Sequence, residues 1–254
     1  MIGTATHRSG RRFTMAVVVL LIVAVGCGGG GITRNVDDPD LLYEEAFTGM
    51  TEGSFPSGWT LITMAAATLD GPADWSIRSG RFHQASNVHA PPPPGAIDTT
   101  WALNYEGTMV VTGDTSWTNI TYRVQLFARD DDAIGVVFRW QDAPTADADG
   151  NFYRFLMVRD EASGGPKRRL DKKVDGVWTV LDERTNSNDG YAENKWYLIE
   201  IDMVGANITV RVDGNIVFEV SDPEPIPARG LIGLFCYGEE GADFDNIRVY
   251  RRGP

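Results

Sequence analysis

Two carboxylates two positions apart are the first residues of the chain whose types and spacing could do chemistry. Glu200 and Asp202 lie in the segment 196–203, which alternates apolar and polar residues, so both side chains are expected on one face of a β-strand. Retaining glycoside hydrolysis needs a nucleophilic carboxylate and a second carboxyl roughly 5 Å away that protonates the leaving oxygen. Residues two apart supply a nucleophile and a helper but no acid. We therefore interpret this segment as a solvated edge strand of the fold.

A row of arginines offers a second kind of chemistry, which is recognition without bond making. If the strand 119–128 pairs with the strands that follow it, strand alternation places Gln125, Arg139, Arg154 and Arg169 side by side on one sheet face. Guanidinium and amide groups in such a row donate the directed hydrogen bonds that a sugar or a carboxylate requires. We predict these four residues to bind a ligand. The alternative is that each arginine pairs with a neighbouring acid on a solvated surface.

The histidines do not add a recognisable catalytic or zinc site. His7, His83 and His89 show no zinc-ligand spacing, and none of them stands in a recognisable arrangement with a serine and an acid. The sequence therefore identifies no complete set of catalytic residues, and an enzyme is the less favoured interpretation.

Short alternating segments separated by turn signals make up the chain from position 43 onward, and they predict an all-β fold of two packed antiparallel sheets. Long loops at 90–95, 141–150 and 185–193 interrupt the pattern, and such loops at one rim of a sandwich are where binding usually occurs. The predicted strands are 43–47, 75–84, 109–111, 119–128, 133–140, 152–158, 168–174, 177–182, 196–203, 207–212, 215–220, 230–237 and 242–250.

The N-terminal region has the order of a secretory signal. Arg8, Arg11 and Arg12 precede an apolar run that ends at Gly26-Cys27, and this run is too short to span a bilayer. The residues before Cys27 resemble a bacterial lipobox, which implies lipidation of Cys27 and anchoring at the outer membrane or cell surface; an ordinary cleaved signal is the alternative. We predict a signal peptide at 1–26, a Gly-rich tether at 27–41 and one domain at 42–254.

Charge argues against nucleic acid as a partner. The chain has 23 Lys and Arg against 35 Asp and Glu; loss of the three arginines of the predicted signal leaves 20 against 35, a balance of −15. Such a surface repels phosphate backbones and anionic lipid heads, so membrane contact is expected through the lipid anchor only.

Several motifs together resemble the concanavalin A-like lectin/glucanase superfamily, in its laminin-G-like jelly-roll branch. They are Phe55-Pro56-Ser57-Gly58-Trp59, the segment 74–82, Trp196-Tyr197 followed by Val212-Asp213-Gly214, and the closing segment 242–249. The segment 130–139 is also similar to the C-terminal domains of thrombospondins. The resemblance covers roughly residues 42–250 and implies a jelly roll. Glycoside hydrolases of family 16 in this superfamily use an E-x-D-x-x-E pattern, and this chain has Gly205 where the third acid belongs.

The resemblance also implies a structural calcium ion where the first and last strands meet. Glu45 and Asp245 occupy the matching places, and Ca²⁺ favours 6 to 8 oxygen ligands, which backbone carbonyls could complete. The alternative is that Asp245 caps a turn and Glu45 is solvated.

These observations favour a non-catalytic, lipid-anchored surface domain that binds a glycan or another extracellular polymer. Two alternatives stay open because fold does not fix function in this superfamily. One is a glycoside hydrolase or polysaccharide lyase of the same fold, and the other is an adhesion module that binds proteins.

Overall fold

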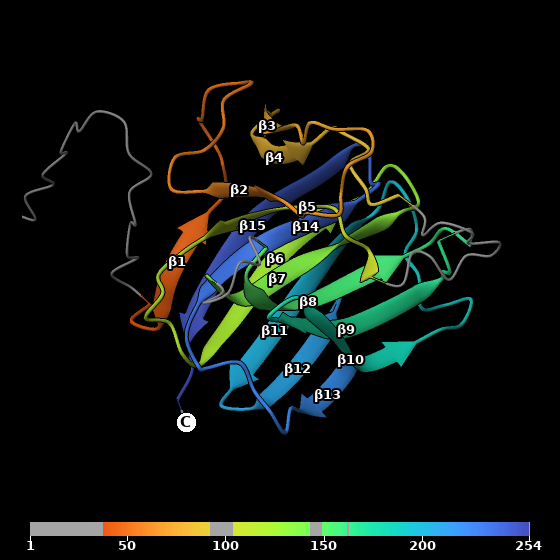
Figure 1. The fold of residues 1–254 in the computed structure, drawn as a ribbon. Helices are drawn as coiled ribbons and strands as arrows, with labels where there is room; N and C mark the ends of the chain where they lie inside the picture. Colours follow the sequence, from red (N-terminus) through yellow and green to blue (C-terminus); the bar gives the residue numbers. More distant parts are fainter. Residues whose placement is uncertain (1–37, 92–103, 143–148, 162, 254) are drawn as a thin grey trace, which may run out of the picture.

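The computed structural model describes residues 38–91, 104–142, 149–161 and 163–253, and this part of the chain holds fifteen strands (Figure 1). The strands are β1 (Leu41–Glu45), β2 (Thr60–Thr63), β3 (Trp75–Arg78), β4 (Arg81–Gln84), β5 (Thr108–Thr112), β6 (Ile120–Phe127), β7 (Ala133–Gln141), β8 (Asn151–Val158), β9 (Lys167–Val174), β10 (Val177–Arg184), β11 (Trp196–Val204), β12 (Asn207–Val212), β13 (Asn215–Ser221), β14 (Leu231–Tyr237) and β15 (Ala242–Arg251).

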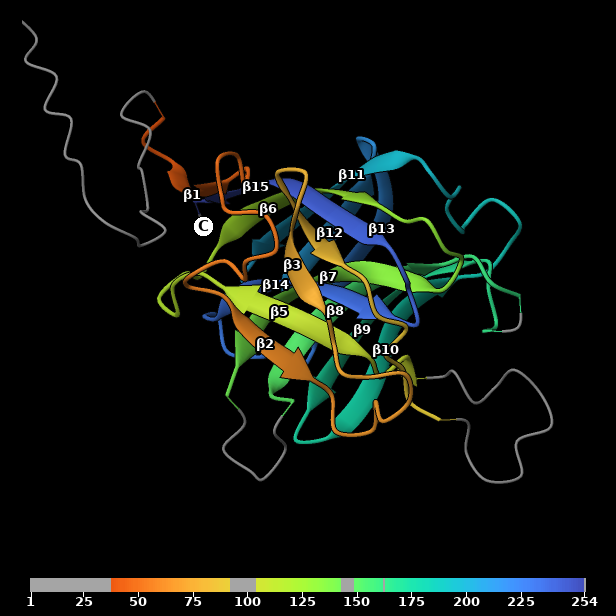
Figure 2. The ribbon, with the colours of Figure 1, turned by 90° about the horizontal axis from the view of Figure 1, so that it is seen from above.

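The strands form two antiparallel sheets that lie one over the other (Figures 1 and 2). The eight-stranded sheet has the order β13-β12-β11-β6-β15-β4-β3, and β1 pairs with β15 beside that path. The seven-stranded sheet has the order β10-β9-β8-β7-β14-β5-β2. The predicted all-β jelly-roll sandwich of two packed sheets is confirmed.

One apolar layer fills the space between the sheets. Alternate residues enter it from both sides: Ile134, Val136 and Phe138 from β7, and Ile199 and Ile201 from β11, all with 0–1% of their surface exposed. A two-layer sandwich requires this period of two, because each strand has one face in the interior and one outside. The alternation of apolar and polar residues in the sequence therefore reflects the packing of one strand face in the interior.

A second apolar layer covers the outer face of the seven-stranded sheet. Val137, Leu156 and Phe235 point outward from this sheet, yet they are buried. Chain segments that precede β5 contribute Met64, Val88 and Tyr105 to the same cluster. The seven-stranded sheet therefore buries apolar residues on both faces, although only the inner face contacts the other sheet.

Two strand predictions are corrected. The segment 75–84, predicted as a single strand, is the hairpin β3–β4, because Ser79 and Gly80 have φ values of 52° and 69° and reverse the chain. Strand β11, predicted as an edge, lies between β12 and β6. Strand β2 was not predicted; it is an edge strand of four residues.

The aromatic cluster around Phe82 gives a prediction about stability. The Phe82 ring is fully buried, and its centroid lies 5.2–5.5 Å from the rings of Phe47, Phe55, Trp59 and Trp75. We expect Phe82→Ala to lower the free energy of unfolding by about 3–5 kcal/mol, since it removes buried apolar surface and leaves a cavity.

The matched control is Ile216→Ala, because Ile216 is 47% exposed and lies on the edge strand β13. Urea denaturation measures both variants. A Phe82→Ala variant as stable as the Ile216→Ala variant would contradict the packing described here.

Candidate functional site

The four residues predicted to bind a ligand do not lie in one row. Gln125 is on β6 of the eight-stranded sheet, whereas Arg139, Arg154 and Arg169 are on β7, β8 and β9 of the other sheet. Strand β6 pairs with β11 and β15 instead of β7, because the chain crosses between sheets after β6. The amide oxygen of Gln125 accepts a hydrogen bond from Asn246 Nδ2 at 2.7 Å. Alternation within a strand does not reveal which sheet the strand joins, so the predicted pairing was wrong.

The Arg139 side chain does not follow the alternation of β7, which would place it on the outer face with Val137. Its φ is 51°, and the β7–β8 register is irregular between Phe138 and Gln141. The buried guanidinium donates from Nη2 to the carbonyl of Gly205 at 2.7 Å and from Nη1 to the carbonyl of Ile226 at 3.3 Å. Arg139 thus ties β7 to the backbone of two loops.

Arg154 lies on the outer face of the seven-stranded sheet and is fully buried. It donates to Asp171 from Nε at 3.1 Å and from Nη2 at 2.8 Å, and Nη1 donates to the Tyr105 carbonyl at 2.9 Å. Its guanidinium carbon also lies 4.2 Å from the centroid of the Trp178 ring. A buried guanidinium held by a carboxylate and a carbonyl is well compensated, and here it fastens the covering segment to the sheet.

Arg169 shares this outer face, beside Leu156 in the register. Its Nε donates to Glu183 Oε2 at 2.6 Å, and its guanidinium carbon lies 5.1 Å from the centroid of the Tyr105 ring. Burial raises the pKa of Glu183, but the charge and hydrogen bond of Arg169 outweigh burial and hold this pKa below its usual value. Ligand binding by Arg154 and Arg169 stays a prediction; in this structure both arginines bind acids of the chain.

The carboxylate motif of β11 is also engaged in ion pairs. Asp202 binds Thr121, Arg211 and Arg252, and Glu200 lies 3.1 Å from Arg211 Nη1. Burial raises the pKa of Asp202, but hydrogen bonds from Thr121 and Arg211 outweigh it and lower the pKa overall. A carboxyl held in its ionised form is a poor general acid, which agrees with the interpretation of this strand as a charged outer face.

The two acids predicted to bind calcium lie on neighbouring strands. Glu45 of β1 pairs with Ile247 of β15, two positions from Asp245. Glu45 Oε1 accepts the N–H of Phe47 at 2.8 Å, and Asp245 Oδ1 accepts the N–H of Asn246 at 2.7 Å. Among the described residues, no group of three or more His, Cys, Asp or Glu could hold a metal ion. Two carboxylates fit a calcium ion only if carbonyl and water oxygens complete the shell.

Of the two cysteines, only Cys236 lies in the part of the chain that the structure describes. Cys27 and the predicted signal lie outside the described residues. Cys236 is buried in β14, and burial raises the pKa of its thiol, as expected for a cysteine that packs as a small apolar residue. Within the described ranges, no helix has the length and apolarity needed to cross a membrane.

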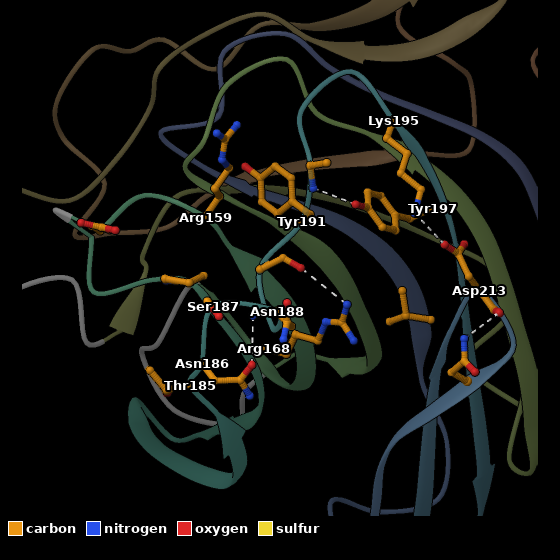
Figure 3. A pocket seen from close by; sticks show the side chains of 16 residues that line it. Arg159, Arg168, Thr185, Asn186, Ser187, Asn188, Tyr191, Lys195, Tyr197 and Asp213 are labelled. Atoms are coloured by element: carbon orange, nitrogen blue, oxygen red, sulfur yellow. Dashed lines mark hydrogen bonds and ion pairs between the residues drawn. The ribbon is translucent and has the colours of Figure 1, made fainter.

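A cavity of about 690 Å³ opens between the sheets at one end of the sandwich (Figure 3). We call it the rim pocket. Its walls come from the ends of β9, β11, β12 and β13, from the segment between β8 and β9 and from the loop 185–195. The lining residues are Arg159, Glu161, Pro166, Arg168, Thr185, Asn186, Ser187, Asn188, Gly190, Tyr191, Ala192, Lys195, Tyr197, Val212, Asp213 and Asn215.

Local hydrogen bonds shape the loop of the rim pocket. Asn186 Oδ1 accepts the N–H of Asn188 at 2.9 Å, and its Nδ2 donates to Asp189. Farther along, the N–H of Ala192 donates to the Tyr197 hydroxyl at 2.7 Å. The loop is therefore built as a turn by its own side chains, which is typical of asparagine-rich segments.

Two cations of the rim pocket are paired with acids, as Figure 3 shows for Lys195. Lys195 Nζ lies 3.2 Å from Asp213 Oδ2 and 4.1 Å from the centroid of the Tyr197 ring. Its pKa is raised, chiefly by the hydrogen bond to Asp213. Arg159 pairs with Glu193. The sequence predicted the loop 185–193, which contains Tyr191, as a binding rim, but it did not single out Arg168 or Tyr197. Arg168 shares its face of the strand with the apolar Leu170, whereas Arg169 lies on the opposite face. This alternation in the sequence could have identified Arg168 as a residue that points inward.

A buried carboxyl stands behind the pocket wall. Glu239 Oε1 accepts the N–H groups of Arg129 at 3.1 Å and of Asp130 at 3.0 Å, and Oε2 lies 2.8 Å from the hydroxyl of Tyr191. Burial raises the pKa of Glu239 to about 8, although these hydrogen bonds oppose the shift. Tyr191 thus connects the rim pocket to a carboxyl whose pKa is raised to about 8.

The family of the chain follows from its sequence. Residues 49–250 match the model of a family described as the 3-keto-alpha-glucoside-1,2-lyase-like domain. The chain belongs to this family. A search of the curated proteins finds no match to this chain.

Solved structures share the fold of the domain. A protein of unknown function with a galectin-like fold from Bacillus subtilis has a TM-score of 0.60 at 12% identity and covers 85% of this chain and 99% of its own. A β-glucanase from Bacillus licheniformis has a TM-score of 0.53 at 14% identity, with 83% and 98% covered. A structure described under endo-acting O-glycanases of the human gut microbiota has a TM-score of 0.55 at 11% identity, with 84% and 100% covered. At these identities the likeness shows a concanavalin A-like jelly roll.

Glu239 gives a prediction about pH. Its pKa is about 8 in the folded domain against an ordinary 4.5, so the folded state keeps this proton to higher pH than the unfolded state does. The stability that the proton contributes is therefore lost as the pH rises from about 4.5 to about 8. We expect Glu239→Gln, which is neutral at every pH, to flatten the fall in melting temperature over this range. Asp132, whose burial raises its pKa to about 6, acts in the same direction and leaves some slope below that pH.

Melting temperature measured from pH 4.5 to 8.5 tests this expectation, with the exposed Glu219→Gln as the matched control. Parallel curves for wild type and Glu239→Gln would show that Glu239 is already ionised in the folded domain.

Proposed function

We propose that this domain binds a glycan or another extracellular polymer in the rim pocket and does not catalyse a reaction. The observation that carries the proposal is the composition of the cavity. Its loop presents the exposed side chains of Thr185, Ser187 and Asn188, and the start of β13 adds Asn215. Hydroxyl and amide groups both donate and accept hydrogen bonds, as a sugar requires, and two tyrosines form an apolar wall.

The names of the relatives support a carbohydrate ligand. The description of the family names a glucoside. The solved structures with TM-scores above 0.5 include a β-glucanase and a structure described under O-glycanases. A cavity with a few convergent polar groups is also the usual form of a small-molecule site. Glycan recognition is therefore the function that the fold and the pocket support together.

The family description brings a second candidate, elimination at a 3-keto-glucoside. That reaction needs a base for the proton beside the keto group and a donor for the enolate oxygen. Asp213 is a carboxylate of the rim pocket, but its Oδ1 accepts the N–H of Leu198 at 2.9 Å and its Oδ2 pairs with Lys195. Both oxygens of Asp213 are engaged, and Glu161, the other carboxylate that lines the pocket, is exposed to solvent, so we place binding ahead of elimination.

The proposal includes an extracytoplasmic location. Cys27 at the end of the apolar run supports a bacterial lipoprotein displayed at the outer membrane or cell surface, with the segment 27–41 as the tether. An extracellular polymer would then reach the rim pocket directly, and the membrane would contact the lipid anchor only.

Removing two amides of the rim pocket tests the binding function. We expect the double variant Asn188→Ala, Asn215→Ala to bind about 30-fold more weakly to the glycan that a glycan array selects, because each of the two lost hydrogen bonds costs roughly 1 kcal/mol. Asn207→Ala is the control, since Asn207 is exposed at the start of β12 and does not line the pocket. The affinities are measured by titration calorimetry.

Equal affinity of the double variant and the control would move the site elsewhere. Incubation with a polysaccharide panel and a 3-keto-glucoside should yield neither reducing ends nor unsaturated products. Turnover that Glu200→Gln abolishes would favour a hydrolase, and a blank array with a protein recovered in pull-downs would favour the adhesion module.

We also propose a structural Ca²⁺ at Glu45 and Asp245, supported by the β1–β15 register and by burial, which raises the pKa of Asp245. A cation beside this carboxylate would offset that burial. We expect EDTA to lower the melting temperature by a few degrees, as loss of a bound ion does. Glu45→Gln with Asp245→Asn should remove the response to EDTA. A wild-type melt that EDTA leaves unchanged would remove calcium from the proposal.

A further inference from the structure

Arg168 differs from the other cations of the rim pocket. Lys195 lies 3.2 Å from Asp213, and Arg159 pairs with Glu193. Within the ranges that the structure describes, no carboxylate lies within ion-pair distance of Arg168. The Nη2 atom of Arg168 donates to the carbonyl of Gly190 at 3.5 Å, which is at the limit of a hydrogen bond. Figure 3 shows its guanidinium inside the cavity, among the residues of the loop.

The guanidinium of Arg168 is also poorly compensated on its inner side. Its Nε is buried and has no hydrogen-bond acceptor in the described part of the chain. Burial lowers the pKa of Arg168, while the charge of Asp189 acts in the opposite direction. Arg154, in contrast, is fully buried and has a carboxylate at 2.8 Å. A partly buried cation without an acid costs free energy, and an anion that enters the cavity would offset this cost.

We propose that the rim pocket selects a sugar that carries a carboxylate, a uronic acid, and that Arg168 receives this carboxylate. The inference rests on the proposed glycan-binding function and names the ligand class. Guanidinium is the side-chain group best matched to a carboxylate, and the amides and hydroxyls of the loop remain for the sugar hydroxyls. The chain as a whole carries a net charge of −12, so a single uronate should be accepted more readily than a dense polyanion.

A matched pair of ligands tests the proposal on the purified protein. Methyl β-glucuronide and methyl β-glucoside differ only in a carboxylate against a hydroxymethyl group. We expect the glucuronide to bind about 10- to 100-fold more tightly in a ligand-observed NMR titration, since a charge-assisted hydrogen bond contributes this much. Arg168→Gln should bring the ratio of the two affinities close to one, and Arg168→Lys should keep part of it. Arg251→Gln is the control, because Arg251 is exposed on β15 outside the pocket.

Stability supplies an independent readout. Because Arg168 has no ion pair to lose, and the more distant charge of Asp189 is outweighed by burial, we expect Arg168→Gln to keep or raise the melting temperature. Arg154→Gln should lower it by several degrees, because it leaves Asp171 buried without its cation. An Arg168→Gln variant that melts several degrees below wild type would show a structural role and overturn the proposal.

The remaining outcomes separate the two levels of the argument. Equal binding of glucuronide and glucoside, unchanged in Arg168→Gln, would overturn the uronate assignment and leave glycan binding standing. Failure of both ligands and of a broad glycan array to bind would overturn both.

Discussion

The dry apolar layer between the two sheets is the constraint on which the other features depend. A charged side chain that points into this layer must be compensated by a partner of the chain, because the interior supplies no water. Lys172 shows the consequence: it points inward from β9, and its ammonium lies 2.8–2.9 Å from both oxygens of the buried Asp222. Arg139 meets the same demand with two backbone carbonyls.

The layer ends at the rim, and there the constraint is relaxed. Arg168 has the parity of Lys172, but it lies near the start of β9, where the space between the sheets opens into the rim pocket. Solvent and loop residues replace the dense interior at this point, so a cation can remain without an acid. The same geometry that forces ion pairs inside the sandwich thus leaves one arginine available to a ligand at its end.

On the outer face of the seven-stranded sheet, in contrast to the rim, the arginines are paired with acids of the chain. Arg154 and Arg169 lie there with their acids, Asp171 and Glu183, and Arg154 also binds the backbone of Asn104 and Tyr105. These contacts hold a chain segment over the sheet. A face that is fastened in this way contributes stability to the fold, and it explains why the binding site is sought at the rim.

The sequence allowed the fold to be predicted more fully than the site. Strands such as β7 and β11 were predictable because a half-buried strand must alternate, and the loop 185–193 was predictable because it breaks that alternation. The sheet of Gln125 was not, since alternation is the same whichever sheet a strand joins. The partners of Arg154 were not either, because Asp171 and Tyr105 approach it only after the chain has folded. The alternation of β9 could have placed Arg168 on the inner face of its sheet, with Leu170, but it carries no information on how close Arg168 lies to the rim.

The most direct test of the account is a map of backbone amide chemical shifts during titration with a glycan that binds. We expect the largest changes in the loop 185–195 and in the turn from Asp213 to Asn215, which together line the rim pocket. Changes confined to the outer face of the seven-stranded sheet, around Tyr105 and Trp178, would contradict it.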